Sequence, residues 1–145
     1  MVAQTTVSGT LSREMLAAHN QVRTKVGVPP LIWSQKLAAL AQQWADELLA
    51  SGKFTHRAKP QYGENLFELR GTHANPAQVV ADWAAEARDY DAASQACRSG
   101  AVCGHYTQLV WRNTKQVGCG VAHLREREAW VCNYDPPGNV VGERP

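Results

Sequence analysis

Apolar residues recur three and four positions apart in three stretches of the chain, which predicts three amphipathic helices. The first begins at the N-cap Ser12, the second lies between Ser34 and Gly52, and the third begins at Asn75-Pro76. The second is the clearest, because a capping serine precedes it and a glycine ends it. Its inward positions are Leu37, Leu40, Ala41, Trp44, Ala45, Leu48 and Leu49.

Shorter apolar runs occupy the C-terminal third of the chain. The segments Val117–Ala122 and Ala129–Tyr134 predict the two strands of a β-hairpin. Leu31–Trp33 predicts a short strand or an extended connector, and His105–Trp111 predicts one or two helical turns. Three helices and a small antiparallel or mixed sheet predict an α+β domain, with helices covering both faces of the sheet.

The composition excludes several classes of protein. The chain has 145 residues, enough for one domain with a buried core, and 44% hydrophobic against 19% charged residues excludes a disordered chain. There are 15 Lys and Arg and 13 Asp and Glu, a net charge of +2 without a basic cluster, so we expect no nucleic-acid partner. No apolar run approaches the roughly 18 residues of a transmembrane segment.

The first ten residues contain neither a basic start nor a long apolar run, so they are not a signal peptide. We expect residues 1–10 to be a flexible N-terminus and residues 11–145 to form a single domain. If the protein is secreted, its leader has been removed before this sequence begins.

The four cysteines are Cys97, Cys103, Cys119 and Cys132. Four cysteines allow three complete pairings, and no C-x-x-C spacing indicates a zinc ribbon or a thioredoxin-type motif. An even number favours two disulfides formed in an oxidising compartment. The alternative is four buried free thiols in a cytosolic protein.

Common catalytic and nucleotide-binding motifs are absent from the sequence, including the P-loop, G-x-G-x-x-G, H-E-x-x-H and G-x-S-x-G. The candidates that remain are His56, Glu64, Glu86 and His105. Two imidazoles and two carboxylates suit a divalent transition metal if they converge, whereas separately each would have a surface or capping role. Glu86 shares a helix face with Trp83, and a carboxylate at a buried edge needs a partner.

The other histidines carry weaker signals. His19 lies on the apolar face of the first helix, which favours a core or interface position. His73 and His123 fall at predicted loop or strand-end positions, and the sequence assigns them no role.

Several segments together resemble the CAP superfamily, which groups cysteine-rich secretory proteins, antigen 5 and pathogenesis-related 1 proteins. The likeness spans about Leu11 to Asn139 and is closest to the single-domain, pathogenesis-related 1-like branch. The segments are Gly104–Trp111, Cys132–Val140, Tyr62–Leu66, Trp83–Glu86, His19–Arg23 and Leu31–Trp33.

The resemblance implies a three-layer α-β-α sandwich with a small central, largely antiparallel sheet. It also implies a central cavity lined by His56, Glu64, Glu86 and His105, in which the two imidazoles bind zinc or a similar divalent cation. Two protein ligands predict a weak, exchangeable site whose affinity falls below about pH 6.5 as the imidazoles protonate.

The resemblance bears on the cysteines as well. It implies a local Cys97–Cys103 disulfide beside His105. Plant relatives typically carry six cysteines, and the family partners of Cys119 and Cys132 are missing here. These two form a bond only if they lie opposite each other in the hairpin, at a Cα separation of about 5.5 Å. Otherwise both thiols are buried and free.

The resemblance implies a secreted protein, extracellular or periplasmic, that binds a small lipid or sterol and acts in defence or host interaction. Trp44 and Trp83 are interpreted as core residues rather than as a lipid groove. The alternative is a metal-dependent hydrolase or peptidase, with Glu64 or Glu86 as general base. Against it, the sequence supplies no nucleophile, oxyanion hole or third protein ligand. Homodimers occur among relatives, and the sequence leaves the oligomeric state open.

Overall fold

The computed structural model describes residues 2–145, with side chains described from Gly9 onward. The helices are α1 (Val2–Val26), α2 (Gln35–Ser51), α3 (Pro76–Ala84), the short 3-10 helix η1 (Ala85–Asp89) and α4 (Gly104–Leu109). The strands are β1 (Ile32–Trp33), β2 (Gly63–Arg70), β3 (Tyr90–Asp91), β4 (Ala96–Cys97), β5 (Gln116–Leu124) and β6 (Arg127–Asp135).

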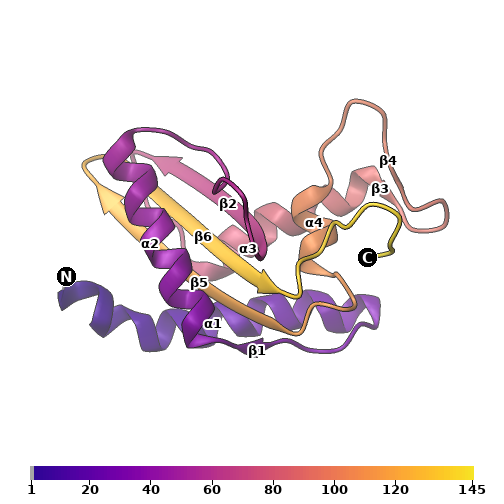
Figure 1. Cartoon of the computed structure of the whole chain (residues 1–145), viewed down its shortest axis with the longest axis horizontal. Helices are drawn as coiled ribbons and strands as arrows, with labels where there is room; N and C mark the ends of the chain where they lie inside the picture. Colours follow the sequence, from indigo (N-terminus) through magenta and orange to yellow (C-terminus); the bar gives the residue numbers. More distant parts are fainter. Residues whose placement is uncertain (1) are drawn as a thin grey trace.

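The central sheet has the strand order β1-β5-β6-β2. Only β1 and β5 are parallel, and the other neighbours are antiparallel. Helix α2 covers one face, and α1, α3 and α4 cover the other (Figure 1). The predicted α+β class and three-layer sandwich are therefore confirmed. Strands β3 and β4 form a separate small ribbon beyond α3.

Alternation along the strands sends side chains into two separate cores. The core under α2 consists of Ala41, Ala45, Leu48, Leu49, Leu66, Ala122, Ala129 and Val131. The core under α1, α3 and α4 includes Met15, Val79, Trp83, Leu109, Val117, Trp130 and Tyr134. Trp83 lies in this second core, as predicted, whereas Trp44 is only partly buried against the first.

Helix α2 lies unusually close to β5. A Cβ atom added at Gly118 would lie 2.2 Å from the backbone nitrogen of Ala38, and one at Gly120 would lie 2.6 Å from the Cα of Gln42. These contacts are shorter than side-chain atoms tolerate, so the helix packs directly against strand backbone at both positions. Only glycine is compatible with this approach.

Two of the three predicted helix starts are confirmed, and the third is wrong. Ser34 caps α2 by accepting a hydrogen bond from the Leu37 amide, and Gly52 ends it with a φ of 73°. Asn75 caps α3 as predicted. Helix α1, however, begins at Val2 rather than at Ser12, because no proline precedes Ser12 and serine is tolerated inside a helix. Met1 lies outside the described residues, and the flexibility of residues 1–10 stays a prediction.

Strand β2 is not among the predicted elements. All eight of its residues pair with β6, from Gly63 opposite Tyr134 to Arg70 opposite Arg127. Its Glu and Asn residues have low strand propensity, so the partner strand rather than the local sequence determines its conformation.

Hydrogen bonds from Arg23 link α1 to the segment between α4 and β5. Its side chain is fully buried, and its guanidinium donates hydrogen bonds of 2.7–3.2 Å to four carbonyls. The acceptors are the carbonyls of Pro29, Leu109, Trp111 and Thr114. Burial, the largest effect, lowers the pKa of Arg23 to about 10, which still leaves it charged at neutral pH.

Candidate functional site

His56 and Glu64 form the first of two histidine–carboxylate pairs. His56 lies in the loop after α2, and its Nδ1–H donates to Oε1 of Glu64 at 2.7 Å. The Arg57 amide donates to the same oxygen at 3.0 Å. The other oxygen, Oε2, is buried and has no hydrogen-bond partner among the described residues. The hydrogen bond to Glu64 raises the pKa of His56 above its usual value.

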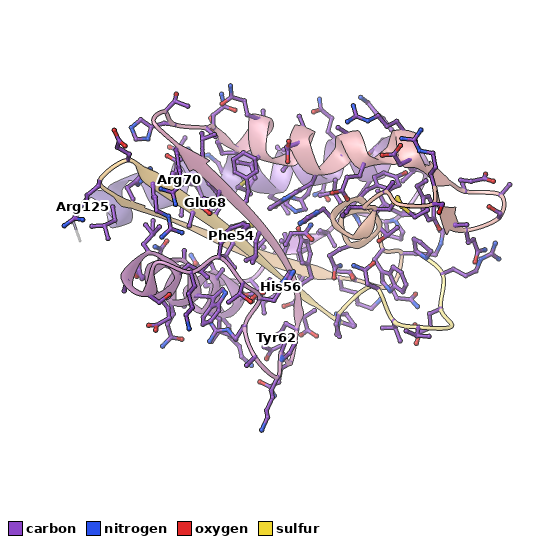
Figure 2. The ribbon with its side chains drawn as sticks, turned by 90° about the horizontal axis from the view of Figure 1, so that it is seen from above. Phe54, His56, Tyr62, Glu68, Arg70 and Arg125 are labelled. Carbon is purple, nitrogen blue, oxygen red and sulfur yellow. A yellow bond between two sulfur atoms is a disulfide. The ribbon has the colours of Figure 1, made fainter. Side chains whose placement is uncertain are left out.

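Figure 2 shows where His56 lies. His56 and Phe54 lie beside β2, and Glu68 and Arg70 follow further along the same strand. The His56 side chain is 62% exposed, whereas that of Glu64 is 4% exposed. The pair therefore joins an accessible imidazole to an almost completely buried carboxylate.

Glu86 and His105 form the second pair. Glu86 lies in η1, and its Oε2 accepts from Nδ1–H of His105 at 2.7 Å. Its Oε1 accepts from the backbone amides of His105 and Tyr106 at 3.0 and 3.1 Å, so the same carboxylate caps α4. The Trp83 ring stacks on His105 with centroids 6.2 Å apart. Glu86 thus has the partner that its buried-edge position predicted.

Both pairs have the same chemistry. Each carboxylate accepts a hydrogen bond from Nδ1–H of its histidine. In a neutral ring this leaves the lone pair on Nε2. Among the described residues, neither Nε2 atom has a hydrogen-bond partner. This arrangement prepares an imidazole to coordinate a metal through Nε2 while the carboxylate fixes its tautomer.

Asn65 connects the two pairs. It follows Glu64 on β2, and its Nδ2 donates to the His105 carbonyl at 3.1 Å and to the Tyr134 hydroxyl at 3.2 Å. Because strand residues alternate, Glu64 faces α2 while Asn65 faces α4, so the pairs flank the edge strand β2. Among the described side chains, no three of the four predicted ligands bring their ligand atoms within 4.8 Å of one another. A cation shared by both imidazoles stays a prediction.

His19 belongs to the core, as its sequence position indicated. It is fully buried, its Nδ1–H donates to the Met15 carbonyl at 2.8 Å, and its Nε2 accepts from the Tyr134 hydroxyl at 2.8 Å. Burial lowers the pKa of His19 to about 4 and raises the pKa of the Tyr134 hydroxyl. The bonds run in one direction, from Asn65 through Tyr134 to a neutral His19.

The two longest family-like segments bind each other. The Gly138 amide donates to Oε1 of the buried Gln108 at 2.9 Å, and Nδ2 of Asn139 donates to the Gly104 carbonyl at 2.9 Å. Gln108 and Gly104 belong to the first segment, and Gly138 and Asn139 to the second. These residues therefore hold α4, and with it His105, in place.

The expected Cys97–Cys103 disulfide is present, and Cys119 and Cys132 form the second bond, which the sequence left open, so none of the four cysteines is free. Cys97–Cys103 closes a short loop directly before His105. Cys119 and Cys132 are opposite each other in the β5–β6 ladder, with Cα atoms 4.1 Å apart. That separation is shorter than the roughly 5.5 Å of typical disulfides, and the two residues face each other directly across the antiparallel ladder, where Cα atoms are closer than in most disulfides.

A further group of titratable side chains lies at the far end of the hairpin. His73 and His123 both donate to Oε2 of the buried Glu128, at 2.8 and 2.6 Å. The sequence assigned no role to either histidine. The hairpin register could have indicated half of this contact, because it places His123 opposite Glu128.

A pocket of about 560 Å³ lies between the end of α1, the β3–β4 ribbon, α4 and the C-terminal residues. Its lining combines apolar groups with two arginines, Arg112 and Arg144, and one carboxylate, Glu143. The apolar lining residues are Val26, Val28, Tyr90, Ala92, Tyr106, Val110 and Pro145. Tyr106, which follows His105 in α4, is the lining residue nearest in sequence to the second pair.

Across residues 2–145, no helix combines the length and the hydropathy of a membrane span. The profile of the CAP: Cysteine-rich secretory protein family matches residues 16–134. Pathogenesis-related protein 1A of Nicotiana tabacum is 46% identical over 134 residues, which cover 92% of this chain and 79% of that protein.

Solved structures show a similar fold. The venom allergen-like protein 4 of Schistosoma mansoni superimposes with a TM-score of 0.71 at 26% identity, over 89% of each chain. The crystal structure of NaASP2 with Zn2+ superimposes with a TM-score of 0.75 at 21% identity, over 92% of this chain and 83% of that one.

Proposed function

Because the chain belongs to the CAP family of cysteine-rich secretory proteins, we propose that it is an extracellular, defence-type binding protein with two ligands. One ligand is a divalent cation of the zinc class, held by Nε2 of His56 and Nε2 of His105. The other is a small lipid in the pocket beside α4. Two disulfides support an oxidising compartment.

The observation that carries the cation proposal is the unpaired oxygen of Glu64. A buried carboxylate oxygen without a donor is costly, and a nearby cation or its bound water would satisfy it. His56 and His105 would bind the cation. Glu64 and Glu86 would go on accepting the hydrogen bonds from Nδ1–H of His56 and His105, and would so orient both rings. When bound, the cation would polarise its water. NaASP2, a protein of the same fold, has a crystal structure with Zn2+, which supports a cation of this class.

The lipid proposal rests on the chemistry of the pocket. Its volume of about 560 Å³ lies within the range of small-molecule sites, and most of its lining is apolar. Two arginines, Arg112 and Arg144, outnumber the one lining carboxylate, Glu143, and would pair with an acidic headgroup. A fatty acid therefore fits this lining better than an uncharged sterol.

Zinc titration by calorimetry tests the cation proposal. The titration uses the His123→Ala background, so that the histidines near Glu128 do not contribute. We expect His56→Ala or His105→Ala to weaken zinc binding at least tenfold, and the exposed Glu14→Gln to leave it unchanged. Zinc binding that survives the loss of both imidazoles would contradict the proposal.

Binding of a fatty acid and of cholesterol tests the lipid proposal. Ala92 is exposed and lines the pocket, so Ala92→Trp fills the pocket without disturbing the core. We expect this variant to lose fatty-acid binding, while His105→Ala keeps it. If Ala92→Trp binds fatty acid as well as the unmodified chain does, the pocket is not the lipid site.

A peptide library incubated with the zinc-loaded protein tests the hydrolase alternative. Turnover that a chelator abolishes and zinc restores would favour a hydrolase over a binding protein. We expect no turnover under conditions in which zinc and fatty acid both bind.

A further inference from the structure

Three side chains converge near the C-terminal end of β2, away from the two pairs described above. They are His73, in the loop before α3, His123 on β5 and Glu128 on β6. Both imidazoles donate to the same oxygen, Oε2 of Glu128, and the rings meet edge to face with centroids 5.2 Å apart. Among the side chains from Gly9 onward, they are the only group of at least three His, Cys, Asp or Glu residues with ligand atoms within 4.8 Å of one another.

Glu128 is a fixed and buried carboxylate. Its side chain is 2% exposed, and Oε1 accepts from Nε1 of Trp130 at 2.7 Å and from the Ala74 amide at 2.9 Å. These two bonds immobilise the group and leave Oε2 to the histidines. No described Lys or Arg side chain lies within 4.0 Å of it. A buried carboxylate without a permanent positive partner is suited to a cation.

The histidines are accessible where the carboxylate is not. The side chains of His73 and His123 are 77% and 49% exposed. An ion can therefore approach from solvent, and both rings can adjust around it. The nitrogens that now donate to Glu128 are Nδ1 of His73 and Nε2 of His123.

We propose that His73, His123 and Glu128 form a second binding site for a divalent cation of the zinc class. Two imidazole nitrogens and one carboxylate oxygen make a ligand set that zinc accepts, with one position left for water. On binding, Nδ1 of His73 and Nε2 of His123 coordinate the ion, and each neutral ring carries its proton on the other nitrogen. Trp130 and Ala74 then supply the outer hydrogen bonds that orient the carboxylate.

This site is independent of the cation site proposed above. Glu64 pairs with Asn133 at one end of the β2–β6 ladder, and Leu69 pairs with Glu128 near the other. Five residues of extended strand separate these two positions by about 17 Å. Substitutions at one site therefore leave the ligands of the other in place.

The five histidines of the chain make the assignment testable. His19 is buried in the core, two belong to the first site and two to the second. The experiment starts from the double variant His56→Ala/His105→Ala and measures zinc by equilibrium dialysis and calorimetry. We expect about one zinc per chain, and at least a hundredfold loss of affinity when His123→Ala or His73→Ala is added.

Nitrogen-15 chemical shifts of the histidine rings report which ring nitrogen carries the proton. They therefore distinguish zinc coordination from the present hydrogen bonds to Glu128. We expect zinc to shift the proton of His73 from Nδ1 to Nε2. The matched control is Glu126→Gln, which removes an exposed carboxylate from the adjacent turn and should leave zinc binding unchanged. Zinc binding that is absent from the folded double variant, or that is unaffected by loss of both His73 and His123, would overturn the proposal.

Discussion

The Tyr134 hydroxyl donates a hydrogen bond of 2.8 Å to Nε2 of His19, and both side chains are fully buried. This bond requires a neutral imidazole, because a protonated Nε2 can no longer accept. The other ring nitrogen, Nδ1, carries the proton and donates a hydrogen bond to the Met15 carbonyl. The core between α1 and the sheet is therefore built for one protonation state of His19.

Acid should destabilise the protein through His19. Burial lowers its pKa from 6.5 to about 4, so the unfolded chain binds a proton in this interval that the folded chain does not. Stability therefore falls as the pH decreases from about 6.5 to 4, by about 3 kcal/mol from this group. Denaturant unfolding at pH 7 and pH 4 measures the loss. His19→Gln should lose about 3 kcal/mol less over the same interval, and equal losses would contradict the assignment.

Arg23 should be essential for stability. Truncation to alanine leaves four carbonyl oxygens in a buried site without their donor, so we expect Arg23→Ala to cost about 3–5 kcal/mol. Arg13 lies on the same helix and is exposed, so Arg13→Ala should change stability by less than about 0.5 kcal/mol. Urea unfolding compares the two variants, and similar costs would show that the buried hydrogen bonds contribute little.

A single methyl group at Gly118 should displace α2. The added Cβ would lie 2.2 Å from the Ala38 nitrogen, and the three nearest atoms all belong to the backbone, so no side chain can rotate away. We expect Gly118→Ala to cost at least about 1–3 kcal/mol. Gly104→Ala is the matched control, because its Cβ would meet only Nδ2 of Asn139 at 3.7 Å. Thermal unfolding distinguishes them, and equal midpoints would mean that the α2–β5 contact is looser than described.

Glu86→Gln should impair the proposed cation site without removing a ligand. The amide oxygen can still cap α4, but the amide nitrogen would face Nδ1 of His105 and turn that ring to the other tautomer. Nε2 would then carry the proton, and we expect zinc affinity to fall 10- to 100-fold. Calorimetry in the His123→Ala background measures this effect, with Glu68→Gln on β2 as control. Unchanged affinity would show that Glu86 does not set the tautomer.

Local signals predicted α2 and the β5–β6 hairpin well. The Ser34 side chain caps the start of the helix, and the left-handed backbone of Gly52 ends it. The predicted hairpin brings Cys119 opposite Cys132. Such features depend on residues close together in sequence. Strand β2 was missed, because its Glu and Asn residues are held in a strand by β6, more than fifty positions away.

In the candidate site, too, the sequence identified the residues but not the contacts between distant segments. The sequence identified His56, Glu64, Glu86 and His105, and the structure forms them into two hydrogen-bonded pairs. It could not show that β2 lies between the pairs, since that depends on sheet order. The contact of His73 with Glu128 spans fifty-five positions and has no local pattern, so it emerges only from the folded chain.

The two glycines of β5 also constrain how this fold can diversify. With α2 resting on bare main chain at Gly118 and Gly120, exchanging side chains at these positions cannot reshape that layer. The opposite layer has no such restriction, because the end of α1, α4 and the β3–β4 ribbon meet around an open pocket. Selection for a new ligand would therefore act on the layer opposite α2, while the α2 layer serves as an unchanging base.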